Sequence, residues 1–222
     1  MKLRQVILAR SIRQVSIASG GAPQIDAIAQ IKQKYEFLKA PEKIEELRPS
    51  PVQAQMAGLA FLEGKFQIGS RSIGISSLQF LPNLLILDTR SSTEDSDVIL
   101  DDYLAHVAKR GSGSVIPLGP SYYVSQLEFT MERVPGILPQ FEKAGRTVDR
   151  CLRDYGLNLP EYGFWSVALN VDQHGLAQLQ PAYFSLERRA GFPFKENMFF
   201  SQAPLQTKDH IALLEQFDSP LH

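Results

Sequence analysis

The chain has 222 residues, of which 44% are hydrophobic and 21% are charged, the composition of a globular protein with a proper core. Its 23 basic and 24 acidic residues leave a formal net charge of -1, so no overall field draws it toward nucleic acid or anionic lipid. One cysteine, Cys151, excludes a disulfide within the chain and a multi-cysteine zinc site. No apolar run reaches the ~20 residues of a membrane helix. We therefore expect a cytoplasmic protein that does not span a membrane. We do not expect nucleic acid to be its partner.

The first half of the chain predicts a strand, a helix, a meander and a second helix. The helix after Pro23 is indicated by the 3.6-residue spacing of Ile28, Ile31 and Tyr35. The meander is indicated by three short strand-like segments whose links of two or three residues can join only antiparallel neighbours. The predicted elements are a strand starting over Gln5–Leu8, meander strands over 66–69, 72–81 and 84–89, and a helix over about 95–110.

The second half predicts a strand, a long helix, a hairpin and a terminal helix. Pro117 and Pro120 extend the gap before the strand, and the turn over 172–175 is typical of a β-hairpin. The predicted elements are a strand over 122–131, a helix ending at Tyr155, hairpin strands over 164–171 and 176–188, an edge strand at Phe199–Phe200, and a helix over 207–217.

This order of elements lacks the regular alternation of strand and helix that a doubly wound sheet requires. It predicts an α+β fold with a mostly antiparallel sheet, formed by the meander and the C-terminal hairpin, and with the two long helices and the terminal helix packed on one face. No linker forces a boundary, so we expect a single domain over 1–222. The halves 1–111 and 112–222 each combine strands with one long helix and are candidates for pseudo-equivalence, although no sequence identity between them is evident.

Acidic residues are concentrated where the strand over 84–89 meets the next helix. Ser92 or Thr93 is expected to cap the helix, and its first acids are expected to meet the positive end of the helix dipole. On a helical wheel the apolar residues occupy one side, and the acids on the other side are expected to face water. The apolar side comprises Ile99, Leu100, Tyr103, Leu104 and Val107, and the acidic stripe comprises Glu94, Asp97 and Asp101. Capping, the helix dipole and exposure to water account for the other acidic residues and leave only Asp88 without a structural explanation. Arg90 is the first candidate to pair with the Asp88 carboxylate.

The alternative interpretation makes Asp88, Glu94 and Asp95 ligands of Mg²⁺ or Mn²⁺ beside a phosphate, because hard cations prefer carboxylate oxygens. Such a site would serve a phosphoester hydrolase or a nuclease. The segment resembles the Asp-x-Asp-x-Thr loop of haloacid-dehalogenase-like phosphatases only in part. Arg90 stands where the second aspartate would be, and the strand before it is predicted to be antiparallel. The family is therefore not assigned.

Two further groups of side chains are candidates for contacts with a partner. One is a basic stripe on the long helix before Tyr155, which is either a solvated helix face or a contact for an acidic surface. The other is an aromatic, arginine-containing segment that either folds back over the core or anchors another protein. The basic stripe comprises Lys143, Arg146, Arg150 and Arg153, and the aromatic segment comprises Arg188, Arg189, Phe192, Phe194, Phe199 and Phe200.

The sequence contains no assembled catalytic set, so no catalytic residue and no cofactor is assigned. The histidines lack metal-ligand spacing, and there is no Gly-x-Ser-x-Gly motif. The preferred interpretation is a non-catalytic assembly or accessory protein that acts through contacts with a protein partner or through self-association. The alternatives are the metal-dependent hydrolase or nuclease, and a nucleotide or small-ligand sensor that uses the turn over 91–93, whose neighbouring acids would repel an anion.

Overall fold

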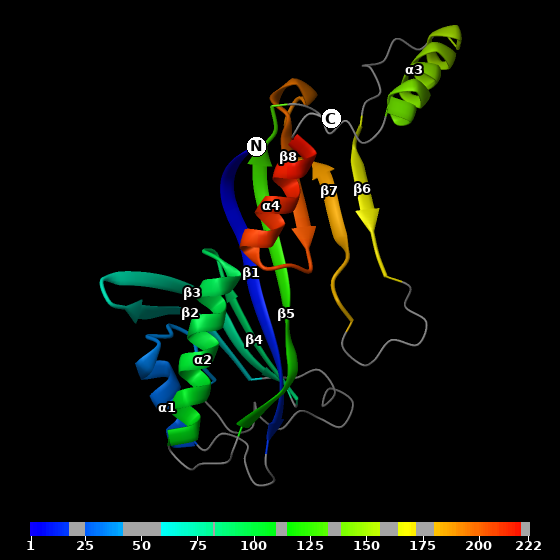
Figure 1. Ribbon diagram of the computed structural model, residues 1–222. Coiled ribbons are helices and arrows are strands. Elements are labelled where there is room, and N and C mark those ends of the chain that lie inside the picture. The colour runs from blue at the N-terminus through cyan, green and yellow to red at the C-terminus, as the bar shows by residue number, and fades with distance from the viewer. Residues whose placement is uncertain are drawn as a thin grey trace. The chain divides into compact units, whose positions relative to one another are not determined.

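The structure is a computed structural model that describes residues 1–17, 25–41, 59–81, 83–109, 115–132, 139–155, 164–171 and 180–218 (Figure 1). The strands are β1 (Lys2–Ile17), β2 (Leu59–Ile68), β3 (Arg71–Leu81), β4 (Leu84–Thr89), β5 (Val115–Thr130), β6 (Ser166–Leu169), β7 (Phe184–Arg188) and β8 (Met198–Ala203). The helices are α1 (Ile25–Lys34), α2 (Thr93–Lys109), α3 (Pro139–Asp154) and α4 (Thr207–Asp218), with a 3-10 turn η2 at Phe194–Glu196. The predicted turn over 172–175 lies outside the described residues.

The strands form one eight-stranded sheet in the order β2-β3-β4-β1-β5-β8-β7-β6. The meander pairs β2 with β3 and β3 with β4, and β1 then pairs antiparallel with β4. At the other end, β7 pairs antiparallel with both β6 and β8. The predicted α+β class with a mostly antiparallel sheet is therefore confirmed.

Two strands are longer than the sequence predicts. β1 has 16 residues, and charged side chains such as Arg10 and Arg13 interrupt its apolar pattern. The strand accommodates these arginines because carboxylates distant in the sequence neutralise their charge. β5 also has 16 residues and passes through Pro117 and Pro120, where a gap is predicted. Proline fits in a strand wherever its missing N–H is not needed by a neighbour, and residues 116–120 of β5 are exposed.

The chain divides into two compact units. Unit 1 comprises Met1–Gln5, Gln126–Ala203 and Lys208–His222, and unit 2 comprises Val6–Ser125 and Pro204–Thr207. A single domain over 1–222 stays a prediction, and each unit is described by itself.

Unit 2 is built around a core between its strands and helices α1 and α2. The buried side of α2 carries Ile99, Leu100 and Tyr103, with Leu104 and Val107 packed against them, which confirms the predicted apolar side. Helix α1 contributes Ile28 and Ile31, and Tyr35 follows directly after it. The strands contribute Phe61, Ile73, Ile75, Leu78, Leu85 and Leu87. Both helices therefore cover the same face of the meander.

Unit 1 has a smaller core beneath α4. Phe129 of β5 stacks on Phe199 of β8 at 6.1 Å between ring centroids. Phe184 of β7 lies 6.5 Å from the His210 ring and 6.1 Å from Phe217, both on α4. Leu186 and Leu214 are fully buried. The face of β7 and β8 that carries these side chains is the face that α4 covers.

The succession strand, helix, three strands, helix occurs twice, from β1 to α2 and from β5 to α4. The sheet order is consistent with this repeat, because β2-β3-β4-β1 corresponds to β6-β7-β8-β5. Aligning α2 and α4 at their first residues places three identical pairs together, namely Thr93 with Thr207, Asp95 with Asp209, and Leu100 with Leu214. The pseudo-equivalence of the halves 1–111 and 112–222 stays a prediction, and the order of elements and of strands supports it.

Among the described residues, no helix is long and apolar enough to cross a membrane. A location in the cytoplasm stays a prediction.

Candidate functional site

Asp88, the penultimate residue of β4, is held by Arg10 of β1. The two residues are direct cross-strand partners, so their side chains project from the same face of the sheet. The Asp88 carboxylate accepts hydrogen bonds from Arg10 Nε at 2.8 Å, from Arg10 Nη2 at 2.9 Å and from Ser77 Oγ at 3.0 Å. The bond to Asp88 raises the pKa of Arg10, although burial of the guanidinium opposes the shift. The prediction that Arg90 pairs with Asp88 is wrong, because strand pairing in the sheet brings Arg10, 78 positions away in the sequence, next to Asp88.

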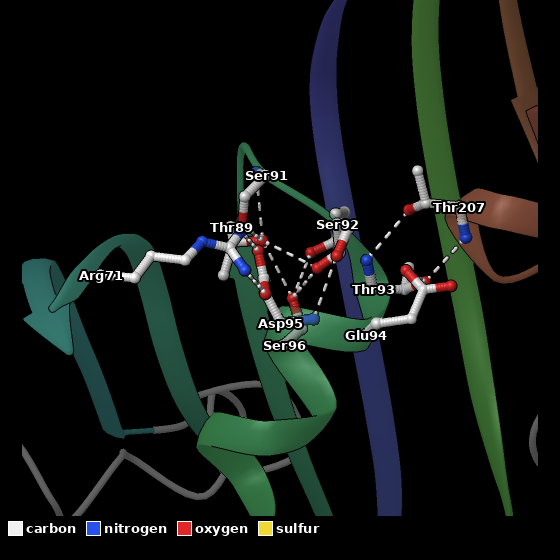
Figure 2. Close-up of polar contacts among 10 residues, drawn as sticks. Arg71, Thr89, Ser91, Ser92, Thr93, Glu94, Asp95, Ser96 and Thr207 are labelled. Carbon is white, nitrogen blue, oxygen red and sulfur yellow. Dashed lines mark hydrogen bonds and ion pairs between the residues drawn. The ribbon is translucent and has the colours of Figure 1, made fainter. Parts of the chain in front are cut away.

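Asp95, in the first turn of α2, is bound by a different arginine. Its two carboxylate oxygens accept hydrogen bonds from Arg71 Nη1 at 2.9 Å and Nη2 at 2.5 Å (Figure 2). Arg71 is the first residue of β3, so this bidentate pair ties the start of the helix to the meander. The backbone N–H of Asp95 donates to Ser92 Oγ at 3.1 Å, which confirms the predicted cap at Ser92 or Thr93.

The hydroxyl groups between β4 and α2 bond to one another and to backbone oxygens. Ser96 Oγ donates to the carbonyl of Ala9 at 2.9 Å and lies 3.0 Å from Thr89 Oγ1. The N–H of Thr93 donates to Thr207 Oγ1 at 2.9 Å, and the N–H of Thr207 donates to Thr93 Oγ1 at 2.8 Å (Figure 2). The amides and hydroxyls of the turn are therefore used within the fold, and this gives no support to the nucleotide-sensor alternative.

Asp97 does not belong to a solvent-facing stripe. Its Oδ1 accepts hydrogen bonds from Arg13 Nη2 and Ser11 Oγ, both at 2.9 Å, and its Oδ2 accepts one from Tyr123 at 2.9 Å. Asp101 is exposed, with 68% of its side-chain surface accessible. The expectation that these acids face water is wrong for Asp97, because strands β1 and β5 supply donors that the helical wheel cannot show.

The three predicted metal ligands are held separately. Asp88 is bound by Arg10, and Asp95 by Arg71. Glu94 Oε2 accepts a hydrogen bond from Thr93 Oγ1 at 3.3 Å, and Figure 2 shows Glu94 directed away from Asp95. Within the described part of the chain, no group of three His, Cys, Asp or Glu side chains could hold a metal ion. Guanidinium groups occupy the carboxylate oxygens that a cation would need, so the Mg²⁺ or Mn²⁺ site stays a prediction without structural support.

Unit 1 presents a cluster of exposed aromatic side chains, which we call the aromatic cluster and define as Trp165, Phe192 and Phe194. Trp165 is 51% exposed, and the two phenylalanines are each 39% exposed. The Trp165 and Phe194 rings lie 6.3 Å apart between centroids. Trp165 lies in the predicted strand over 164–171 and is not among the predicted contact residues, so its exposure is a feature that sequence reasoning missed.

Arg188 holds the two segments of the aromatic cluster together from within. This arginine is 7% exposed, and its Nε donates to the carbonyl of Phe164 and its Nη1 to that of Phe194, both at 2.8 Å. Its guanidinium carbon lies 4.3 Å from the centroid of the Phe194 ring, a cation–π contact. Burial lowers the pKa of Arg188, and the carbonyl groups and the ring compensate for the lost hydration.

The predicted aromatic segment is divided between surface and interior. Phe192, Phe194 and Arg189 are exposed, and Arg189 forms an ion pair with Glu128 at 3.0 Å. Phe199 is fully buried and Arg188 nearly so, and Phe200 is half-buried. Phe199 and Arg188 therefore do not supply surface contacts, because strand β8 carries Phe199 into the core and β7 places Arg188 opposite it.

The basic stripe on α3 is exposed along its length. The side chains of Lys143, Arg146, Arg150 and Arg153 are all exposed. Contact of the basic stripe with another molecule stays a prediction.

No protein-family description matches this chain, and no curated protein is significantly similar to it.

Proposed function

We propose that this protein is a non-catalytic accessory or assembly protein that binds another protein chain through the aromatic cluster. The observation that carries the proposal is the exposure of Trp165 and Phe194 side by side, fixed by a buried arginine. Tryptophan, phenylalanine and arginine are among the residue types enriched in the centres of protein interfaces.

The energetics of the aromatic cluster support this role. Exposed aromatic rings leave a large apolar area in water, and burial of such area contributes roughly 25 cal/mol per Å² on association. The segment that carries Phe194 is already held by the bond from Arg188 to its carbonyl. Docking would therefore lose little conformational entropy, which is the main cost of ordering an interface.

The contacts at the acidic junction, defined as Asp88, Glu94 and Asp95, support a structural role for these carboxylates. Two of its three carboxylates form bidentate pairs with arginines, and the third accepts a hydroxyl hydrogen bond. Such pairs fix register and helix position in a fold. No observation at this junction favours the hydrolase alternative over the accessory protein.

The test is affinity capture from the cells that produce the protein, with the tagged wild-type chain compared with a Trp165→Ala/Phe194→Ala variant. Removing two anchors of about 2 kcal/mol each lowers the affinity by roughly a thousandfold. We expect a partner, identified by mass spectrometry, to be recovered with the wild-type chain and lost with the variant. Where the partner is a second copy of the same chain, light scattering of the purified protein detects the self-association.

The matched control is Ile68→Ala/Ile116→Ala, which removes two exposed apolar side chains outside the aromatic cluster. This control is expected to recover the partner as well as the wild-type chain does. The proposal fails if the wild-type chain is a monomer that captures the same proteins as the cluster variant.

A further inference from the structure

Helices α1 and α3 occupy corresponding places in the repeated order of elements, because each precedes the first strand of a three-stranded meander. Each is followed directly by a tyrosine, Tyr35 after α1 and Tyr155 after α3. Counting back from these tyrosines, Ile28 and Ile31 of α1 correspond to Val148 and Cys151 of α3. The two helices thus carry the same spacing of apolar positions on one face.

The two apolar faces differ in their environment. Ile28, Ile31 and Tyr35 are buried in the core of unit 2, and Tyr35 is 0% exposed. Tyr155 is 74% exposed, Val148 is 40% exposed, and Cys151 is half-buried. An amphipathic helix of this kind gains its stability mainly by burying its apolar stripe.

Strand β6 carries an apolar surface of matching character, which we call the β6 strip and define as Trp165, Val167 and Leu169. Val167 and Leu169 are the cross-strand partners of Leu186 and Phe184, so they lie on the face of the sheet that α4 covers. Leu169 is 62% exposed, Trp165 is 51% exposed and Val167 is half-buried. The β6 strip therefore continues the apolar surface beneath α4 to the last strand of the sheet.

We infer that the β6 strip is a helix-docking surface and that its occupant is α3 of the same chain, packed through Val148, Cys151 and Tyr155 as α1 is packed through Ile28, Ile31 and Tyr35. Two observations select this occupant: the continuity of the strip with the surface that α4 covers, and the equal spacing of the apolar positions on α1 and α3. The basic stripe of α3 lies on the opposite side of the helix and remains in water in the docked arrangement.

This packing goes beyond the proposed function and does not depend on it, because α3 docks within one chain whether or not a partner exists. It has a consequence for access, since Trp165 belongs both to the β6 strip and to the aromatic cluster. Helix α3 in its docked position therefore covers Trp165, so a partner that binds through the aromatic cluster must compete with α3 for this side chain.

The test uses Cys151, the only cysteine of the chain, in cross-linking with a short bismaleimide. In the Leu169→Cys variant we expect a cross-link between positions 151 and 169 within one chain, identified by peptide mapping of the monomer. The matched control, Ala168→Cys, places an exposed cysteine on the opposite face of the same strand, β6, and is expected to remain unlinked to Cys151. Absence of the intrachain link, or a link found only between two chains, would overturn the inference.

A second measurement uses Trp165, the only tryptophan, in the otherwise unmodified chain. We expect Val148→Asp to undock α3, and therefore to shift the Trp165 emission to longer wavelength and strengthen its quenching by acrylamide. The control Thr147→Asp adds the same charge at an exposed position of α3 and is expected to leave both properties unchanged. Identical spectra and quenching for the two variants would contradict docking.

Discussion

At the junction of β4 and α2 two buried carboxylates are paired with arginines, whereas the polar contacts described at the corresponding junction of β8 and α4 join neutral groups. Asp88, penultimate in β4, pairs with Arg10 and Ser77. The penultimate residue of β8 is Gln202, which accepts a hydrogen bond from Gln126 at 2.7 Å. On α4, His210 Nε2 lies 2.9 Å from Ser201 Oγ, which donates to the carbonyl of Ser185 at 2.6 Å.

The two junctions show that one arrangement of strands and helix can be fixed by either kind of bond. The ionic junction depends on pairs of carboxylate and guanidinium groups, and the neutral junction depends on an imidazole that remains uncharged. Acid is expected to weaken the neutral junction, because burial lowers the pKa of the His210 imidazole. The comparison can therefore be tested by substitutions at corresponding positions and by titration.

The largest effect is expected where the two repeats are alike. Leu100 of α2 and Leu214 of α4 are aligned, and both are fully buried. Changing either to alanine is expected to lower the free energy of unfolding by about 3 kcal/mol, through lost burial and the cavity left behind. Urea unfolding measures both variants. A loss below about 1 kcal/mol at only one position would break the correspondence of the two helices.

Acid is expected to weaken the neutral junction through His210. Burial lowers the pKa of His210 from 6.5 to about 4, so the folded state resists a proton that the unfolded state accepts. Stability is present above pH 6.5 and is lost as the pH falls toward 4, by up to about 3 kcal/mol. Urea unfolding between pH 7 and 4 tests this, with His210→Gln as the reference. A wild-type pH dependence no steeper than that of His210→Gln would contradict it.

The charged junction is expected to be more sensitive to loss of its central residue than the neutral one. Asp88→Asn leaves Arg10 without its counter-ion and is expected to cost about 2 kcal/mol, less than a fully buried pair because the Arg10 side chain is 32% exposed. Gln202→Ala removes a neutral hydrogen bond and is expected to cost about 1 kcal/mol. Thermal unfolding at pH 7 compares them. Equal losses would remove the distinction between the junctions.

The smallest effect concerns the first turns of the two helices. Ser92→Ala removes the acceptor of the Asp95 N–H and is expected to cost about 1 kcal/mol, a typical value for a lost N-cap. The corresponding position before α4 is Gln206, a residue type that caps poorly, so Gln206→Ala is expected to change stability by less than about 0.5 kcal/mol. Parallel urea titrations give both values, and a larger loss at Gln206 would reverse the prediction.

Local sequence patterns predicted most of the secondary structure. The helix expected over about 95–110 is α2 at Thr93–Lys109, and the terminal helix expected over 207–217 is α4 at Thr207–Asp218. Both have an apolar stripe and a clear beginning, which are local signals. The lengths of β1 and β5 were not predictable in this way, because their polar residues become compatible with a strand only when distant partners are in place.

The site was harder to predict than the fold for the same reason. Capping by Ser92 is a local property and could be read from the sequence. The pairing of Asp88 with Arg10 and of Asp95 with Arg71 depends on sheet order and register, which single-sequence patterns do not provide. The exposure of Trp165 could not be predicted, because alternation along β6 gives the face of the sheet on which a side chain lies, but not whether a helix covers that face.

The reciprocal bonds between Thr93 and Thr207 place a condition on the order in which the chain can fold during synthesis. The N–H at the start of α2 is satisfied by a hydroxyl that is translated 114 residues later. A nascent chain that has completed the meander and α2 therefore has this amide still bonded to water. The first turn of α2 reaches its final state only when Pro204–Thr207, which belongs to unit 2, has left the ribosome. Unit 2 is in this sense the first to begin folding and cannot finish before the last helix begins.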